Sequence, residues 1–393
     1  MQTWLFFLLP IAALSGWLMA RKHYKNKYQP QDNKLSPEYF SGLNYLLNEQ
    51  PDKAIDVFIH LLEVNSETVE THLALANLFR RRGETDRAIR IHQNLIARPT
   101  LNSQQRSQAL LELGLDYMKA GVLDRAEQLF LDLLQQASPP EQAIKKLLRI
   151  YQQEKHWEKA IDMAKRLQPE QRKDIGILIA QFYCELAQQQ ITSSASSIRG
   201  YLKQAQHYDH NCVRASLLEA NMQITAGKYG KALKTLQRIE RQNHRYLPEA
   251  LPKLLNCYQK MGNIDGFNSW LQQLVERHPH MTSARLMLTQ VIQQQQGSQA
   301  AQEFLYQQLH TYPSIEGLHE LLLLGQGSNQ SLIPLITNIT NSLIDKGDRY
   351  SCQNCGFAGK AMHWHCPSCA NWGSIHPTEI HLSALEKLLE PSS

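Results

Sequence analysis

The fold of this 393-residue chain is decided by residues 111–130, which read Leu111-Glu-Leu-Gly-Leu-Asp-Tyr-Met-Lys-Ala-Gly-Val-Leu-Asp-Arg-Ala-Glu-Gln-Leu-Phe130. The stretch fits a helix–turn–helix with Gly121 at the turn, and Pro139 follows the second helix. A small residue in each helix, Gly114 and then Ala126, lets the two helices cross closely. The small residue of the second helix recurs at spacings of 34, 38 and 34 residues, at Ala54, Ala88, Ala126 and Ala160.

A 34-residue helix–turn–helix with this pattern is the tetratricopeptide repeat, or TPR. We count five clear units and three degraded ones, which predicts an all-α fold, a TPR superhelical solenoid over residues 36–313. Another α-solenoid of similar period is the alternative. The fifth unit has a turn stretched over Gln188–Ser197, with Ile198 at the small position. Beyond Pro313 the pattern decays, and residues 314–348 are predicted to form capping helices.

Stacked TPR units form a concave groove lined mainly by first helices, and such grooves bind peptides or partner proteins. The register predicts five groove residues, Asn77, Arg80, Arg81, Lys145 and Arg149. The sharper hypothesis is a groove for an acidic tail. The alternative is a solvated basic face, which charged runs commonly form.

Residues 1–20 are predicted to be a transmembrane anchor. No side chain from Gln2 to Ala20 is charged, and a helix of about 18 residues rises about 27 Å, close to the hydrocarbon thickness of a bilayer. Basic residues follow in a juxtamembrane linker, residues 21–35. They predict a single-pass protein whose remaining chain is cytoplasmic, and they could touch anionic head groups. A cleaved signal peptide, the alternative, has its basic residues before the apolar run.

Outside the anchor, the charge is nearly balanced. The formal net charge is +5, and four positive charges belong to Arg21, Lys22, Lys25 and Lys27, which leaves about +1 for the remainder. A balance near zero argues against a general nucleic-acid binder. Three of the seven cysteines lie singly in helical patterns and are predicted to be small buried residues: Cys184, Cys212 and Cys257.

The other four cysteines predict a metal site. Cys352 and Cys355 form one CxxC turn, Cys366 and Cys369 form another, and ten residues separate the turns. Two such turns can supply a tetrahedron of thiolates around one ion, and a closed tetrahedron is structural or transfers electrons. Residues 349–393 are therefore predicted to be a rubredoxin-like domain that holds iron or zinc, because both metals accept four thiolates.

Other side chains in this segment are predicted to pack rather than to bind metal. His363 and His365 lie between the two turns, and four cysteines already satisfy the ion. The aromatic residues are expected to pack on the last TPR helices: Tyr350, Phe357, Trp364 and Trp372.

No pattern predicts an enzyme. Gly325-Gln-Gly327 lacks the third glycine of a dinucleotide-binding loop. His319-Glu320 is not followed by a second histidine at the metalloprotease spacing.

The combination of anchor, TPR units and double CxxC turn resembles the lipopolysaccharide assembly protein B family of Gram-negative bacteria. The resemblance extends over essentially the full length. It is carried by three stretches, Asn48-Glu-Gln-Pro-Asp-Lys-Ala-Ile-Asp56, Phe182-Tyr-Cys-Glu-Leu-Ala187 and Arg349-Tyr-Ser-Cys-Gln-Asn-Cys-Gly-Phe357 with Trp364-His-Cys-Pro-Ser-Cys369. The stretched fifth unit is a local departure.

The resemblance implies more than the spacing does. Members of the family sit in the inner membrane, face the cytoplasm and favour degradation of the deacetylase LpxC by the membrane protease FtsH, which limits lipopolysaccharide synthesis. The resemblance implies that the rubredoxin-like domain packs on the TPR array and that Cys352, Cys355, Cys366 and Cys369 are its metal ligands. It also implies contacts with other inner-membrane proteins of lipopolysaccharide assembly or sensing, and the chain could form a homodimer.

Two other functions are compatible with the cysteines. One is a rubredoxin-like electron-transfer protein docked to a membrane complex, in which the iron itself is needed. The other is a nucleic-acid-binding ribbon, which the near-neutral charge disfavours.

Overall fold

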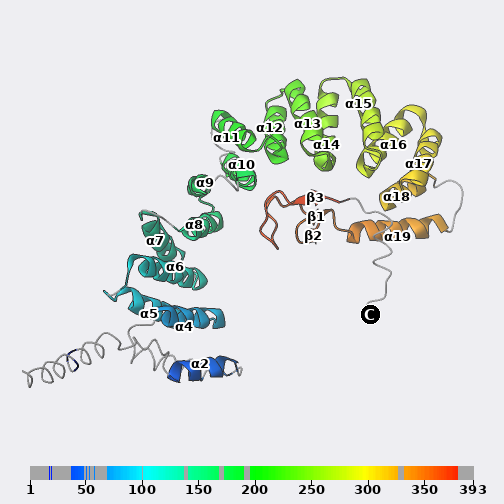
Figure 1. The fold of residues 1–393 in the computed structure, drawn as a ribbon. Helices are drawn as coiled ribbons and strands as arrows, with labels where there is room; N and C mark the ends of the chain where they lie inside the picture. The colour runs from blue at the N-terminus through cyan, green and yellow to red at the C-terminus, as the bar shows by residue number, and fades with distance from the viewer. Residues whose placement is uncertain are drawn as a thin grey trace, which may run out of the picture. The chain divides into compact units, whose positions relative to one another are not determined.

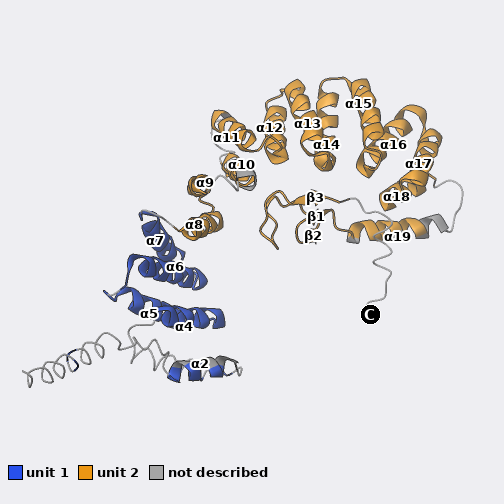
Figure 2. Cartoon of the chain, in the orientation of Figure 1, with its two compact units in different colours: residues 1–139 blue, residues 140–393 orange. Residues whose placement is uncertain are grey.

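The computed structural model describes residues 17, 19, 37–47, 50, 53, 57, 69–99, 101–136, 140–167, 172–189, 195–325 and 332–378. Helices make up most of this part of the chain, and a small sheet follows them (Figure 1). The chain divides into two compact units, residues 1–139 and residues 140–393 (Figure 2).

The predicted anchor and linker lie outside the described residues, apart from Trp17 and Met19, which are helical and exposed. Among the helices that the structure describes, none is both long enough and apolar enough to cross a membrane.

The first unit contains two complete helical hairpins at the predicted second and third repeats. They follow α2 (Pro37–Leu47) and are formed by α4 (Val69–Arg82) with α5 (Thr85–Ile96), and by α6 (Ser103–Lys119) with α7 (Leu123–Leu134). Ala76 and Ala88 are fully buried where α4 crosses α5, in a cluster with Leu75 and Phe79. The small residues therefore lie at the crossing, as the TPR pattern predicts.

The second unit continues the same architecture. Its hairpins are α8 (Glu141–Gln153) with α9 (Trp157–Arg166), α10 (Arg172–Gln189) with α11 (Ala195–Tyr208), α12 (Val213–Thr225) with α13 (Tyr229–Asn243), α14 (Leu247–Lys260) with α15 (Ile264–Arg277), and α16 (Thr282–Gln296) with α17 (Ser298–Thr311). A short 3-10 helix, η3 (His244–Tyr246), joins α13 to α14. Ala160 and Ala232 are fully buried and Ile198 is buried, so the TPR prediction is confirmed here.

The stretched turn of the fifth unit is shorter than predicted. Helix α10 extends to Gln189 and α11 begins at Ala195, so both ends of the predicted Gln188–Ser197 turn are helical. Glutamine has a good helix propensity, and serine and alanine are accepted in the first turn of a helix. The polar composition of this segment therefore led to a predicted turn that is longer than the turn in the structure.

Two further helices, α18 (Ile315–Leu324) and α19 (Leu332–Lys346), lead into a three-stranded antiparallel sheet. Its order is β2-β1-β3, with β1 (Tyr350–Cys352) between β2 (Ala358–Gly359) and β3 (Ile375–Pro377). We call residues 350–378 the knuckle. Within the second unit, the knuckle lies inside the curve of the helices, against η3 (Figure 1).

Gly114 allows α6 and α7 to cross closely. A Cβ atom at Gly114 would lie 2.4 Å from Cε1 and 2.7 Å from Cζ of Phe130, and the Phe130 ring is fully buried. No real side chain tolerates such a distance, so α6 and α7 would have to separate.

We expect Gly114→Val to destabilise the first unit by about 2 kcal/mol, because overpacking a buried crossing typically costs that much. Hydrogen exchange of the α6 and α7 amides in increasing urea measures the change. Gly200→Ala is the matched control, since Gly200 is exposed in α11 and has nothing within 4 Å of its added Cβ. That control should stabilise its helix by about 0.5–1 kcal/mol, and equal effects of both changes would contradict the proposed crossing.

Candidate metal centre

The two CxxC turns have the same backbone pattern. In the first, the Gly356 amide donates to the Cys352 carbonyl at 2.9 Å, and in the second the Ala370 amide donates to the Cys366 carbonyl at 2.9 Å. Both residues are left-handed, with φ of 74° at Gly356 and 56° at Ala370. An alanine in this region costs about 1–2 kcal/mol, so the second turn holds a strain that the first avoids with glycine.

The four sulfur atoms converge on one point. Cys352 Sγ is 3.7 Å from Cys369 Sγ, Cys355 Sγ is 3.7 Å from Cys366 Sγ, and all four sulfurs lie within 4.8 Å of one another. A tetrahedron with metal–sulfur bonds of about 2.3 Å has edges of about 3.8 Å. The four thiols therefore fit one tetrahedral ion with a small contraction of their wider edges, and they could bind a metal.

Hydrogen bonds with neighbouring side chains lower the pKa of two of these thiols. Hydrogen bonding with Ser374, whose hydroxyl is 3.2 Å from the sulfur, lowers the pKa of Cys352 to about 6. A hydrogen bond from the Asn354 side chain lowers the pKa of Cys369. Burial instead raises the pKa of Cys366 to about 11. A cation would have to displace the Cys366 proton, because metals bind the thiolate form.

The two histidines between the turns are exposed. His365 packs its ring on Trp372 with centroids 4.6 Å apart, and His363 lies edge-on to Phe357 at 6.4 Å. Within the described residues, the cluster of possible ligands comprises only the four cysteines. Of the three single cysteines, all are buried as predicted, and Cys184 Sγ is 3.8 Å from Cys212 Sγ.

The knuckle is attached to the repeats by its aromatic residues, in a contact surface that we call the seat. Trp372 lies edge-on to Trp157 of α9 and Phe182 of α10, with centroids 6.1 and 5.9 Å apart. Trp364 stacks on Tyr246 of η3 at 5.4 Å. T-shaped and offset-stacked pairs are the favoured aromatic geometries.

Arg214 of α12 lies at the centre of the seat. Its guanidinium is 5.8 Å from the Trp364 ring and 5.9 Å from the Trp372 ring, and the residue is only 3% exposed. Its Nη2 donates to Glu185 Oε1 at 2.7 Å and also to Gln188. A buried cation is tolerated only with such partners, so Arg214 joins α10, α12 and the knuckle.

Hydrogen bonds complete the seat. The Tyr246 hydroxyl donates to the Ile375 carbonyl of β3 at 2.8 Å, and burial raises the pKa of that tyrosine. The Tyr350 hydroxyl donates to Glu249 Oε1 of α14 at 2.6 Å. Burial, together with that carboxylate, raises the Tyr350 pKa to about 12. Both hydroxyls therefore stay neutral donors.

The prediction that the aromatic residues pack on the last TPR helices is wrong in position. Trp364, Trp372 and Tyr350 contact α9, α10, α12, η3 and α14, which belong to the fourth to seventh repeats. The fourth predicted aromatic residue, Phe357, belongs to the knuckle's own cluster around Cys352 and Cys366. The chain turns back after α18, which brings the knuckle to helices far earlier in the sequence.

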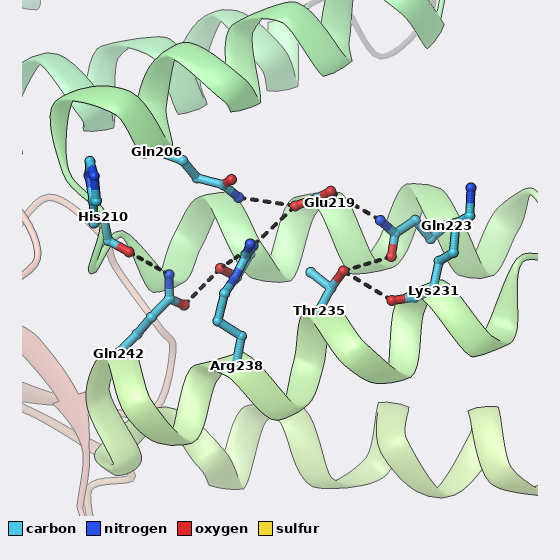
Figure 3. A network of polar contacts seen from close by, with 9 residues as sticks. Gln206, His210, Glu219, Gln223, Lys231, Thr235, Arg238 and Gln242 are labelled. Atoms are coloured by element: carbon cyan, nitrogen blue, oxygen red, sulfur yellow. Dashed lines mark hydrogen bonds and ion pairs between the residues drawn. The ribbon is translucent and has the colours of Figure 1, made fainter.

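A polar network fixes the helix that carries Arg214. Glu219 of α12 accepts hydrogen bonds from Gln206 of α11 at 3.0 Å and from Arg238 of α13 at 3.1 Å (Figure 3). Ser216 of α12 donates to Gln242 of α13 at 2.7 Å. These contacts attach α12 to both neighbouring helices, so Arg214 is presented from a rigid position.

The predicted groove residues have different surroundings. Arg80 pairs with Glu112 at 2.6 Å and with Asp116 at 2.9 Å, both on α6, and its side chain is 18% exposed. Its charge is therefore neutralised inside the first unit. In that unit Arg81 is exposed and Asn77 is partly buried. In the second unit Lys145 is exposed and pairs with Glu141 at 2.7 Å, and Arg149 is exposed. A partner role of these five residues stays a prediction.

Sequence reasoning missed Arg214 and Tyr246. Little in their own repeats marks these two residues, because the knuckle residues that they contact come more than 100 positions later. A buried position on a repeat helix that carries arginine instead of an aliphatic residue was the one available indication.

The chain matches two family models over short segments and known proteins over most of its length. Residues 350–377 match the family described as rubredoxin metal binding domain, and residues 71–105 match the tetratricopeptide repeat family. Lipopolysaccharide assembly protein B of Escherichia coli (strain K12) is 39% identical over 379 residues, which cover 95% of this chain and 97% of that protein. The protein of the same name from Haemophilus influenzae is 38% identical over 392 residues, with the same two coverages.

We expect Cys369→Ser to reduce bound metal from one ion per chain to nearly none, because the remaining three thiols leave the tetrahedron open. Elemental analysis of the purified full chain measures the metal. Cys257→Ala is the matched control, since this buried cysteine lies outside the cluster. Full metal occupancy in the Cys369→Ser protein would refute the four-thiolate centre.

We expect Arg214→Met to loosen the knuckle from the repeats without removing its metal. A desolvated cation–π contact is worth about 2 kcal/mol, and hydrogen exchange should rise by more than tenfold across residues 350–378. Arg214→Lys should give an intermediate result, because an ammonium cannot stack as a planar guanidinium does. Arg199→Met, an exposed position on α11, should change nothing, and unchanged knuckle protection in Arg214→Met would refute the seat.

Proposed function

Because this chain belongs to the lipopolysaccharide assembly protein B family, we propose that it is a TPR adaptor at the cytoplasmic face of the inner membrane. In this proposal it limits lipopolysaccharide synthesis by promoting FtsH-dependent proteolysis of the deacetylase LpxC. The near-complete match to proteins named for lipopolysaccharide assembly carries the proposal. The chain acts by binding, and no step of chemistry is assigned to it.

The construction of the second unit supports a scaffold. Through Trp364, Trp372 and Arg214, the seat attaches the knuckle to three repeat units, by α9, α10 and α12, and to the connecting helix η3. A repeat array otherwise has contacts only between neighbouring repeats and can flex along its length. Cross-links between distant repeats hold the curve of this unit in one form, which suits a surface that must fit a protein partner.

The metal has a structural role in this proposal. Cys352, Cys355, Cys366 and Cys369 would hold iron or zinc, and the ion would supply folding free energy to a segment too small to bury a sufficient core. Four thiolates leave no coordination position for a substrate. The folded knuckle then presents Trp364 and Trp372 to the repeats.

Membrane attachment explains how such an adaptor would work. A scaffold that is tethered through residues 1–20 meets a membrane protease in two dimensions. Tethering raises the effective concentration of any substrate that the scaffold holds, without a new contact. Of the predicted groove residues, Arg81 and Arg149 are the exposed arginines, and each would suit an acidic segment of a partner.

Electron transfer is the second candidate. Cys355 is exposed, and a solvent-facing thiolate on a rubredoxin-like iron offers a route for electrons to a docked partner. In that function the protein would need iron, whereas a scaffold works equally with zinc.

The half-life of LpxC tests the adaptor function. We expect deletion of the gene to lengthen that half-life several-fold, because the protease loses the protein that delivers its substrate. The wild-type chain and Arg199→Met should restore rapid turnover, whereas Arg214→Met should restore it only in part. A pulse-chase with an antibody against LpxC measures the rate.

Two results would reject parts of this proposal. An LpxC half-life that is unchanged by deletion would remove the adaptor function. Loss of rapid turnover in cells whose chain carries only zinc, with the protein folded and abundant, would favour electron transfer instead.

A further inference from the structure

A pocket of about 390 Å³ lies where the knuckle meets the repeats. The knuckle contributes Ser351, Gln353 and Thr378, and the repeats contribute residues around η3 and the α15–α16 connection. The volume lies within the range of small-molecule sites, which is about 300–1,000 Å³. No catalytic or metal function described above uses this pocket.

The lining of the pocket is basic. Of the described residues that line it, none is acidic, and six carry guanidinium or imidazole groups: His244, Arg245, Arg277, His278, His280 and His376. Guanidinium and imidazole groups that lack a carboxylate partner create a positive potential that favours anions.

The guanidinium and imidazole groups of the pocket differ in whether a carboxylate pairs with them. Glu240 takes much of the charge of Arg277, at 2.8 and 3.2 Å, and is also 3.1 Å from His278 Nε2. Arg245 is exposed and has no carboxylate partner among the described residues. Arg245 is therefore the cation that is available to a ligand.

His376 gives an independent indication of a ligand. The residue is 9% exposed, and its buried Nδ1 has no hydrogen-bond partner among the described residues. A buried polar atom without a partner costs free energy, and His376 lines the pocket. A ligand group that reached this nitrogen from the pocket would remove the cost.

We propose that the pocket binds a phosphomonoester, with Arg245 as its main cationic contact and the His376 ring as a hydrogen-bonding partner. A phosphomonoester carries about −1.5 to −2 charges and three acceptor oxygens near neutral pH. A single carboxylate would engage fewer of the donors that surround this volume. Guanidinium groups also match the geometry of phosphate oxygens.

The electrostatics of the pocket agree with this ligand. Burial, then the neighbouring Arg245, lowers the pKa of His376. Burial, then His278 and Arg245, lowers the pKa of His244, against which the Glu240 carboxylate acts in the opposite direction. These imidazoles are thus disfavoured as cations while the pocket lacks an anion, and a bound dianion would relieve their repulsion.

The position of the pocket gives the ligand a structural effect. Its two sides belong to the knuckle and to the repeats, so the complete site exists only while the knuckle is seated. A ligand that binds only this arrangement must stabilise it. This inference does not depend on the proposed adaptor function.

The test uses the full metal-loaded chain in detergent and three probes: inorganic phosphate, glycerol 3-phosphate and dihexanoyl phosphatidic acid. Calorimetric titration measures each affinity. We expect saturable binding, and we expect Arg245→Gln to weaken it by about tenfold or more, since a hydrogen bond to a charged group is lost. Arg241→Gln, an exposed arginine of α13 outside this pocket, should change affinity less than about twofold.

The probes also separate the sources of the phosphate group. Binding of glycerol 3-phosphate assigns a soluble metabolite, and binding of dihexanoyl phosphatidic acid alone assigns a lipid headgroup. Imidazole NMR signals of His244 and His376 should move when the probe binds, which gives a measurement that does not need a variant. Absence of saturable binding by every probe up to about 10 mM, or equal affinities of wild type and Arg245→Gln, would overturn the proposal.

Discussion

Arg214 is a buried cation, and the position of the knuckle depends on how its charge is satisfied. Carboxylate and amide oxygens on α10 accept its hydrogen bonds. The Trp364 and Trp372 rings lie 5.8 and 5.9 Å from its guanidinium. Without the two indoles, water would have to contact the guanidinium of Arg214. The indoles therefore complete the environment of the arginine and are themselves held against the repeats.

The metal site and the repeats stabilise each other through this contact. The knuckle has a buried cluster of only three residues, Cys352, Cys366 and Ile375, so it needs both an ion and a surface to pack on. The repeats gain contacts between helices that do not neighbour one another in the array. The four-cysteine site is therefore part of the helical unit through its contacts with the repeats.

Regular local features of the fold could be predicted from the sequence, and features that join distant segments could not. Ala88, Ala126 and Ala160 reveal the repeats because each lies in the same local pattern, and the CxxC spacing identifies the cysteine cluster. Neither the segment around Trp157 nor the segment around Trp372 has a pattern that indicates their contact. The sequence therefore predicted the wrong helices as partners of the aromatic residues. Arg80 has carboxylate partners 32 and 36 residues later, which is close to one repeat, and attention to that spacing would have revealed the pairing.

The seat also has a consequence for biosynthesis. Trp372 Nε1 donates to Gln152 Oε1 across 220 positions of sequence, whereas the helical hairpins close over one repeat. Hairpins can form as the chain leaves the ribosome, because their contacts are local and fast. The contact between Gln152 and Trp372 can form only after the knuckle, near the end of the chain, has been synthesised. The nascent protein therefore passes through an interval in which α9, α10 and η3 expose the aromatic residues Trp157, Phe182 and Tyr246, and chaperones have that interval in which to recognise them.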